Sequence, residues 1–66
     1  MSTIKKMVSS NGKVRLNLRK TEWDEYEVEW VENDKRNEDK TNYTDDLDDA
    51  VGTMKMMMEH YEKHGN

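Results

Sequence analysis

The sequence has no cysteine and no proline, and its 66 residues contain no long apolar run. Without cysteine the chain can form neither a disulfide bond nor a cysteine-ligated metal site, and it suits a reducing compartment. The missing apolar run excludes a membrane-spanning helix. No apolar segment typical of a signal peptide follows Met1. These absences predict a soluble cytoplasmic protein.

Basic residues are also fewer than acidic ones: the chain has 11 Lys and Arg and 15 Asp and Glu, which gives a net charge of −4. Nucleic-acid binders usually carry a basic balance or a basic stripe, so nucleic acid is not the first expectation. Charged residues make up 39% of the chain and hydrophobic ones 32%, which is toward the disordered side of globular composition. The ordered pattern of the apolar residues predicts a fold. One domain over residues 1–66 is near the lower size limit for an unaided core, and homodimerisation would supplement it.

The residues that catalysis needs are scarce. There is no cysteine nucleophile, the three glycines are scattered, and Ser2, Ser9 and Ser10 lie far in sequence from His60 and His64. No glycine-rich phosphate loop is present, and a sheet with one helix offers no deep cleft. The sequence therefore predicts a protein that is not an enzyme and that needs no cofactor.

The clearest element is an amphipathic helix over residues 44–64. Thr44 suits the N-cap position, and aspartates follow it where the helix dipole is positive. The expected core stripe repeats at spacings of three and four and consists of Leu47, Ala50, Val51, Met54, Met57, Met58 and Tyr61. Gly65 is the expected stop.

Residues 13–43 predict an antiparallel sheet. Two segments, 13–20 and 25–32, alternate apolar and polar residues, which is typical of half-buried strands. A connection over Thr21, Glu22 and Trp23 gives the expected register, which pairs Leu16 with Val28, Val14 with Trp30, Arg15 with Glu29 and Arg19 with Glu25. Opposite charges would then face each other on the solvent side, which favours this register.

The remaining strands are weaker. A polar turn at residues 33–35 precedes a third main strand over 37–43, whose Tyr43 is expected in the core. Residues 1–12 have two interpretations, a short helix or an edge strand. The strand is favoured because Asn11-Gly12 suits a type I′ hairpin turn. The fold class is therefore α+β, with a three- to four-stranded antiparallel meander packed on one C-terminal amphipathic helix.

Three apolar residues have no clear place in this core. Met56 projects away from the core stripe of the helix, and Val31 is expected on the outer sheet face, which Ile4 and Val8 would share. Trp23 lies in the strand connection, where its ring either folds back over the core or stays exposed. Trp is enriched at interface hot spots and Met at adaptable binding surfaces. We therefore expect Trp23, Val31 and Met56 to contact a partner.

Two polar clusters suggest metal ligation but have simpler explanations. Asp45, Asp46, Asp48 and Asp49 do not match the spacing of a calcium loop, and a helix start accounts for them. His60 and His64 are four residues apart, as metal ligands on a helix can be, but no third strong ligand is evident. No metal site is predicted.

The order of three strands followed by a helix, with the corner Tyr43-Thr44 and Ala50 in the first turns, resembles the DNA-binding domains of AP2 factors and the arm-binding domains of tyrosine recombinases. The resemblance covers residues 13–60 and implies a DNA-facing sheet surface, here Lys13, Arg15, Asn17, Arg19, Glu25, Glu27, Glu29 and Lys40. Three glutamates at its centre depart from a phosphate-binding pattern, so the DNA-binding role is not carried over.

The expected function is a small non-enzymatic protein-binding module. Its size, acidity and Met- and Tyr-rich composition resemble small phage proteins, so an accessory protein of a phage or mobile element that modulates a host protein in the host cytoplasm is the leading hypothesis. One alternative is nucleic-acid contact through Lys13, Arg15 and Arg19 on the sheet. Another is an acidic decoy of nucleic acid that presents Glu27, Glu29 and the aspartate cluster at 45–49.

Overall fold

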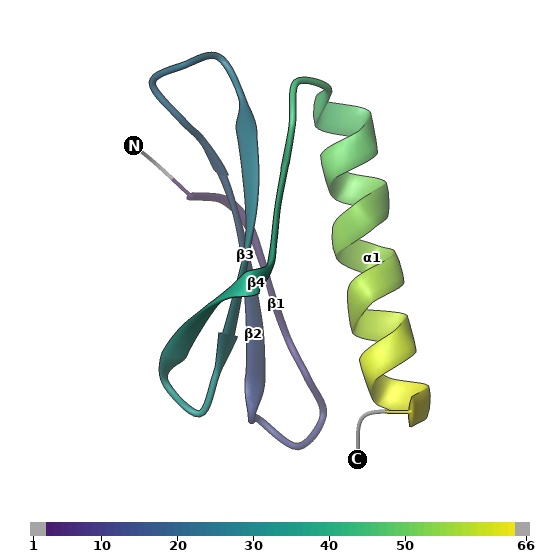
Figure 1. Cartoon of the computed structure of the whole chain (residues 1–66). Helices are drawn as coiled ribbons and strands as arrows, with labels where there is room; N and C mark the ends of the chain where they lie inside the picture. Colours follow the sequence, from purple (N-terminus) through teal and green to yellow (C-terminus); the bar gives the residue numbers. More distant parts are fainter. Residues whose placement is uncertain (1–2, 65–66) are drawn as a thin grey trace.

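The computed structural model describes residues 3–64, which form a four-stranded antiparallel sheet with one helix lying along it (Figure 1). The elements are β1 (Thr3–Val8), β2 (Val14–Lys20), β3 (Tyr26–Glu32), β4 (Lys35–Thr44) and α1 (Leu47–His64). Each strand pairs with the next along the chain, in the order β1-β2-β3-β4. The predicted α+β meander is confirmed, and the N-terminal segment is a strand. Within residues 3–64, no helix is long and apolar enough to cross a membrane.

The hydrophobic core lies between α1 and the inner face of the sheet. It consists of Val14, Leu16, Leu18, Val28, Trp30, Ala50, Met54, Met58 and Tyr61. The alternation of β2 and β3 and the three- and four-residue spacing of α1 place these residues on facing surfaces. Two expected core residues lie elsewhere: Leu47 is 38% exposed and Tyr43 is 50% exposed. Leu47 is the first residue of α1.

The register between β2 and β3 differs from the expected one by two residues. Leu16 pairs with Trp30 and Leu18 with Val28, while Arg19 faces Glu27. The cause is a longer connection, which the N–H of Thr21 closes by donating to the carbonyl of Glu25 at 2.7 Å. An even shift leaves every side chain on its predicted face, so the predicted faces are confirmed and the predicted partners are wrong.

The tight two-residue hairpin lies at Asn33 and Asp34. Both have positive φ, 53° and 65°, as a type I′ turn requires, and they join the paired residues Glu32 and Lys35. The β1–β2 connection is longer: the N–H of Ser9 donates to the carbonyl of Val14 at 2.9 Å. There Gly12 has positive φ and its neighbour does not, so the type I′ turn predicted at that position is wrong.

A large bulge divides β4 and reverses which side chains face the helix. Trp30 pairs with Asn37 and Val28 with Asn42, so residues 38–41 stand opposite Glu29 alone. β4 therefore has three more residues than β3 at this point. Because side chains alternate between the two faces of a strand, an odd number of extra residues moves every later side chain of β4 to the opposite face. Tyr43 therefore lies on the outer face, opposite Glu27, and the prediction that it joins the core is wrong.

The helix begins later than predicted. Thr44 is the last residue of β4 and pairs with Tyr26. Its hydroxyl accepts from the N–H of Asp46 at 3.3 Å, but α1 begins three residues later, at Leu47, so Thr44 is not the N-cap. Asp46 takes that role, because its carboxylate accepts from the N–H of Asp48 at 2.9 Å and its carbonyl accepts from the N–H of Ala50 at 3.0 Å. The expected stop at Gly65 lies outside the described residues.

Candidate functional site

An open hollow of about 550 Å³ lies between β4 and α1. Its lining residues are Trp30, Lys40, Asn42, Met56, Met57 and His60. The bulge places Asn42 opposite Val28 of the inner face, so the side chains of Lys40 and Asn42 in β4 point toward the helix. Lys40 had been expected on the outer sheet face, and the same reversal makes that expectation wrong.

Trp30 forms the aromatic floor of this β4–α1 hollow. Its ring meets Tyr61 edge-on, with centroids 5.8 Å apart and planes at 78°, which is a favoured aromatic geometry. Its Nε1–H donates to the Glu32 carboxylate at 3.2 Å, and the Lys40 ammonium lies 4.6 Å from the ring centroid. These contacts fix the indole and hold one cation over an apolar surface.

Two methionines form the helical wall of the hollow. Met54 and Met58 are buried in the core, Met57 is half-buried against it, and Met56 is 67% exposed. The prediction that Met56 projects away from the core is confirmed. Flexible, polarisable thioethers adapt to different partner surfaces, so this wall can accept an apolar side chain of variable shape.

His60 contributes an imidazole to the lining. Its ring lies 4.8 Å from that of His64, tilted by 47°. Within residues 3–64, no group of three or more His, Asp and Glu side chains is arranged to hold a metal ion. The chemistry that the hollow offers is therefore apolar contact, with a lysine and an imidazole at its rim.

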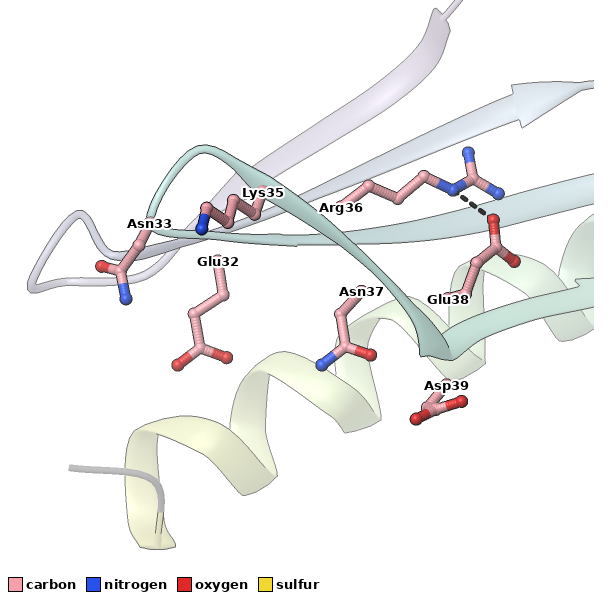
Figure 2. Close-up of a pocket in the computed structure, with 7 residues that line it drawn as sticks. All are labelled: Glu32, Asn33, Lys35, Arg36, Asn37, Glu38 and Asp39. Atoms are coloured by element: carbon pink, nitrogen blue, oxygen red, sulfur yellow. Dashed lines mark hydrogen bonds and ion pairs between the residues drawn. The ribbon is translucent and has the colours of Figure 1, made fainter.

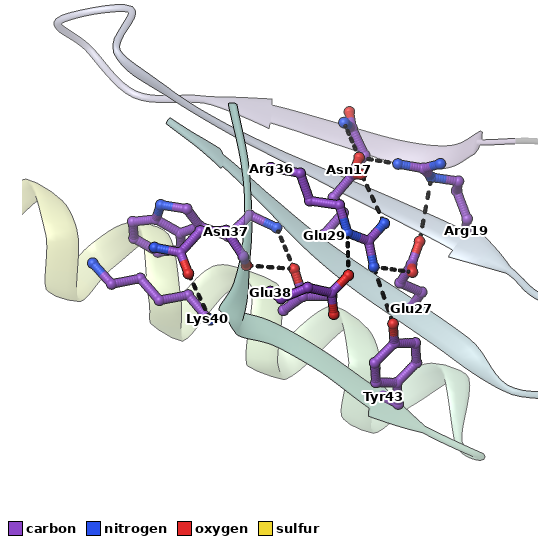
Figure 3. A network of polar contacts seen from close by, with 11 residues as sticks. Asn17, Arg19, Glu27, Glu29, Arg36, Asn37, Glu38, Lys40 and Tyr43 are labelled. Carbon is purple, nitrogen blue, oxygen red and sulfur yellow. Dashed lines mark hydrogen bonds and ion pairs between the residues drawn. The ribbon is translucent and has the colours of Figure 1, made fainter. Parts of the chain in front are cut away.

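The outer sheet face carries a polar network instead of free charges (Figure 3). Glu27 and Glu29 are buried there, with side chains 9% and 10% exposed, and both carboxylates contact the guanidinium groups of Arg19 and Arg36. Arg36 reaches Glu27 at 2.9 Å and Glu29 at 3.0 Å. Arginine bound to several carboxylates is a strong, geometrically specific arrangement.

Further hydrogen bonds complete this network. Asn17 donates to Glu29 at 3.0 Å, and Arg36 donates to the Tyr43 hydroxyl at 3.0 Å and to Glu38 at 2.6 Å. Hydrogen bonds to Glu38 and Glu27 raise the pKa of Arg36 above its ordinary value, so Arg36 stays charged. Arg36 was missed in the sequence because the face it occupies depends on the two-residue turn before it.

The network engages part of the basic surface predicted to contact nucleic acid. Arg19 is bound to the two buried glutamates, Arg15 pairs with Asp34 at 3.0 Å, and Lys13 is exposed. A cation already paired within the protein has less to gain from a phosphate. The same contacts bury Glu27 and Glu29, so these two residues do not present the open acidic surface of a decoy.

Val31 lies on the outer face as predicted, opposite Arg15 and Arg36, but it is 8% exposed. The expectation that it offers free apolar surface is therefore wrong, because neighbouring side chains cover it. Val8, which pairs with Arg15 from the other side, is 59% exposed. A hollow of about 390 Å³ on this face is lined by Thr3, Lys6, Met7, Val8, Arg15, Asn17, Arg19, Glu29 and Val31.

Trp23 is the most exposed large apolar side chain in the described part of the chain, at 77%. It belongs to the β2–β3 connection, whose tip stands clear of the helix (Figure 1). Of the two interpretations of Trp23, the structure supports exposure. Neither Trp23 nor Val31 lines the β4–α1 hollow, so the structure separates the three residues that were predicted to contact one partner.

A third hollow, of about 460 Å³, lies at the β3–β4 turn (Figure 2). Its lining is polar and charged throughout and consists of Glu32, Asn33, Lys35, Arg36, Asn37, Glu38 and Asp39. There the Arg36 guanidinium donates a hydrogen bond to the Glu38 carboxylate. Of these three hollows, the β4–α1 hollow is the one whose lining includes a tryptophan and two methionines.

The resemblance to AP2 and arm-binding domains stays a prediction from the order of the elements. No family model, no curated protein and no solved structure matches the chain.

Proposed function

We propose that the protein is a small non-enzymatic protein-binding module that binds its partner at the β4–α1 hollow. The observation that supports this is Met56, 67% exposed beside the half-buried Met57, above a fixed tryptophan. Small open sites with apolar walls and a few polar groups at the rim are typical binding sites. That the module is an accessory protein of a phage or mobile element stays a prediction from the sequence.

The size of the expected contribution follows from the exposed surface. Full burial of a methionine side chain is worth about 1.5–3 kcal/mol, and Met56 has two thirds of its surface free to bury. A partner that covers it would therefore gain about 1–2 kcal/mol from this residue. That gain corresponds to a change in affinity of about 5- to 30-fold.

The test is capture of a partner from a lysate of the source cells by the tagged protein after nuclease treatment. Met56→Asp places a charge in the hollow, and Val8→Asp makes the same charge change at an apolar residue of similar exposure on β1. We expect one stoichiometric protein to be captured by the wild type and by Val8→Asp, and to be lost with Met56→Asp. The purified pair should bind with the same dependence.

Two results would contradict the proposal. Capture that Met56→Asp leaves unchanged would remove the hollow as the binding surface. Loss of all captured material after nuclease treatment would favour nucleic-acid contact through the sheet.

A further inference from the structure

The chain itself carries a side chain suited to the β4–α1 hollow. Trp23 is 77% exposed, and the residues around it are acidic: Glu22, Asp24 and Glu25, all exposed. Asp24 pairs with Lys20 at 3.6 Å, and both side chains are more than half exposed, so this pair is weak. The β2–β3 connection thus presents one large aromatic ring within a set of carboxylates.

The hollow has the complementary chemistry. Its apolar surface comes from Trp30, Met56 and Met57, and its rim carries the ammonium of Lys40 and the imidazole of His60. A volume of about 550 Å³ is within the range of about 300–1,000 Å³ typical of ligand sites. Sulfur–aromatic contacts and stacking on an adaptable methionine wall suit an indole, and a lysine at the rim suits its acidic neighbours.

Trp23 does not occupy the hollow of its own chain. It is absent from the lining, and its connection turns away from the helix at the end of the sheet where α1 begins (Figure 1). The hollow lies further along α1, beside Met56, Met57 and His60. Because Trp23 and the hollow lie apart on one chain, Trp23 can enter a β4–α1 hollow when two chains associate, in which case it enters the hollow of the other chain.

We infer that Trp23 of one copy fills the β4–α1 hollow of a second copy, and that reciprocal exchange of this contact closes a homodimer. The inference rests on the proposed function, because it uses the same hollow, and it names a second copy of this chain as the occupant. Two surfaces that differ but are exchanged by a two-fold axis form a closed pair. Glu22 and Glu25 then face Lys40 across the interface.

The test is sedimentation equilibrium of the full chain at near-physiological salt, from low micromolar to near-millimolar concentration. We expect the wild type to pass from monomer to dimer. Trp23→Ala and Met56→Asp each remove both reciprocal contacts, so at about 30-fold for each lost hot spot we expect each variant to weaken dimerisation by about 900-fold. Val8→Asp is the matched control and should dimerise as the wild type does. Both test residues are largely exposed, and circular dichroism of each variant checks that the fold is kept.

A mixing experiment identifies which two surfaces meet. The Trp23→Ala chain keeps an intact hollow, and the Met56→Asp chain keeps an intact tryptophan. An equimolar mixture of the two can form one of the two contacts, so we expect it to dimerise more strongly than either variant alone. A mixture no stronger than its components would overturn the assignment of Trp23 to the hollow.

The outcomes separate this inference from the proposed function. A wild type that stays monomeric over the whole range, or a Trp23→Ala variant that dimerises like the wild type, would overturn the inference. In that case, capture of another protein that still depends on Met56 would leave the proposed function standing. Dimerisation that depends on Trp23 and Met56, without any Met56-dependent capture, would support the inference and overturn the binding of a different protein.

Discussion

Replacing Arg36 with methionine tests the polar network of the outer sheet face. The substitution keeps an unbranched side chain and removes the guanidinium that contacts Glu27 and Glu29. Arg19 then remains as the single cation beside two carboxylates that are about one tenth exposed. Hydrogen bonds to Glu38 and Glu27 raise the pKa of Arg36. The stabilisation that its charge provides is lost only above that raised pKa, so Arg36→Met removes a full charge at any ordinary assay pH.

The expected magnitude lies between two limits. Breaking a buried ion pair by removing one partner costs about 3–5 kcal/mol, and losing an exposed pair costs about 0–1 kcal/mol. The Arg36 side chain is 34% exposed, and Arg19 still pairs with both glutamates, so we expect a loss of about 2 kcal/mol. For a domain of this size that lowers Tm by about 8–16 °C.

Urea unfolding followed by tryptophan fluorescence measures the free energy of unfolding, with an unchanged m-value as the check on two-state behaviour. Arg15→Met is the matched control, because Arg15 is 49% exposed and its partner Asp34 is 92% exposed. It should cost less than about 0.5 kcal/mol. Adding Glu27→Gln to Arg36→Met should recover about 1 kcal/mol, since one carboxylate then faces one arginine. Equal effects of the two arginine substitutions would refute the reasoning.

Two further predictions concern the backbone. Gly12→Ala should destabilise the fold by about 1–2 kcal/mol because Gly12 has φ +75°, whereas Gly52→Ala in α1 should stabilise it by about 0.5–1 kcal/mol. A Cβ at either position meets nothing within 4 Å, so the backbone conformation alone separates the two substitutions. Thermal unfolding that shifts stability in the same direction for both variants would contradict this prediction. Asp46→Ala should cost about 1 kcal/mol as the loss of an N-cap, measured by the same unfolding method, with Asp45→Ala near zero as its control.

Local patterns correctly predicted the elements and the buried faces of β2, β3 and α1. The alternation of Val14, Leu16 and Leu18 placed β2 on the core, and the spacing of Ala50, Met54 and Met58 gave the buried side of α1. These patterns depend on the period of a strand or helix, which is a property of the local chain. The exposure of Met56 follows from the same geometry.

Errors appeared where a connection set the register. The β2–β3 connection includes Glu25, whose carbonyl closes it, so each pair moved by two residues. The N-cap of α1 is Asp46 and not the predicted Thr44, because Thr44 is still paired in the sheet. In each case two local structures compete for the same residues, and contacts with a distant strand decide between them.

The sequence by itself determined that the chain forms an antiparallel meander with one amphipathic helix, because hydrophobic periodicity specifies which face each element buries. Tertiary structure alone decided which side chains meet. The bulge in β4, opposite Glu29, exchanges the two faces of that strand. It brings Lys40 and Asn42 to Met56 and Met57, and it leaves Tyr43 beside Arg36 on the outer face. An odd excess of residues in one strand depends on how that strand pairs with its neighbour, so it leaves no period in the sequence.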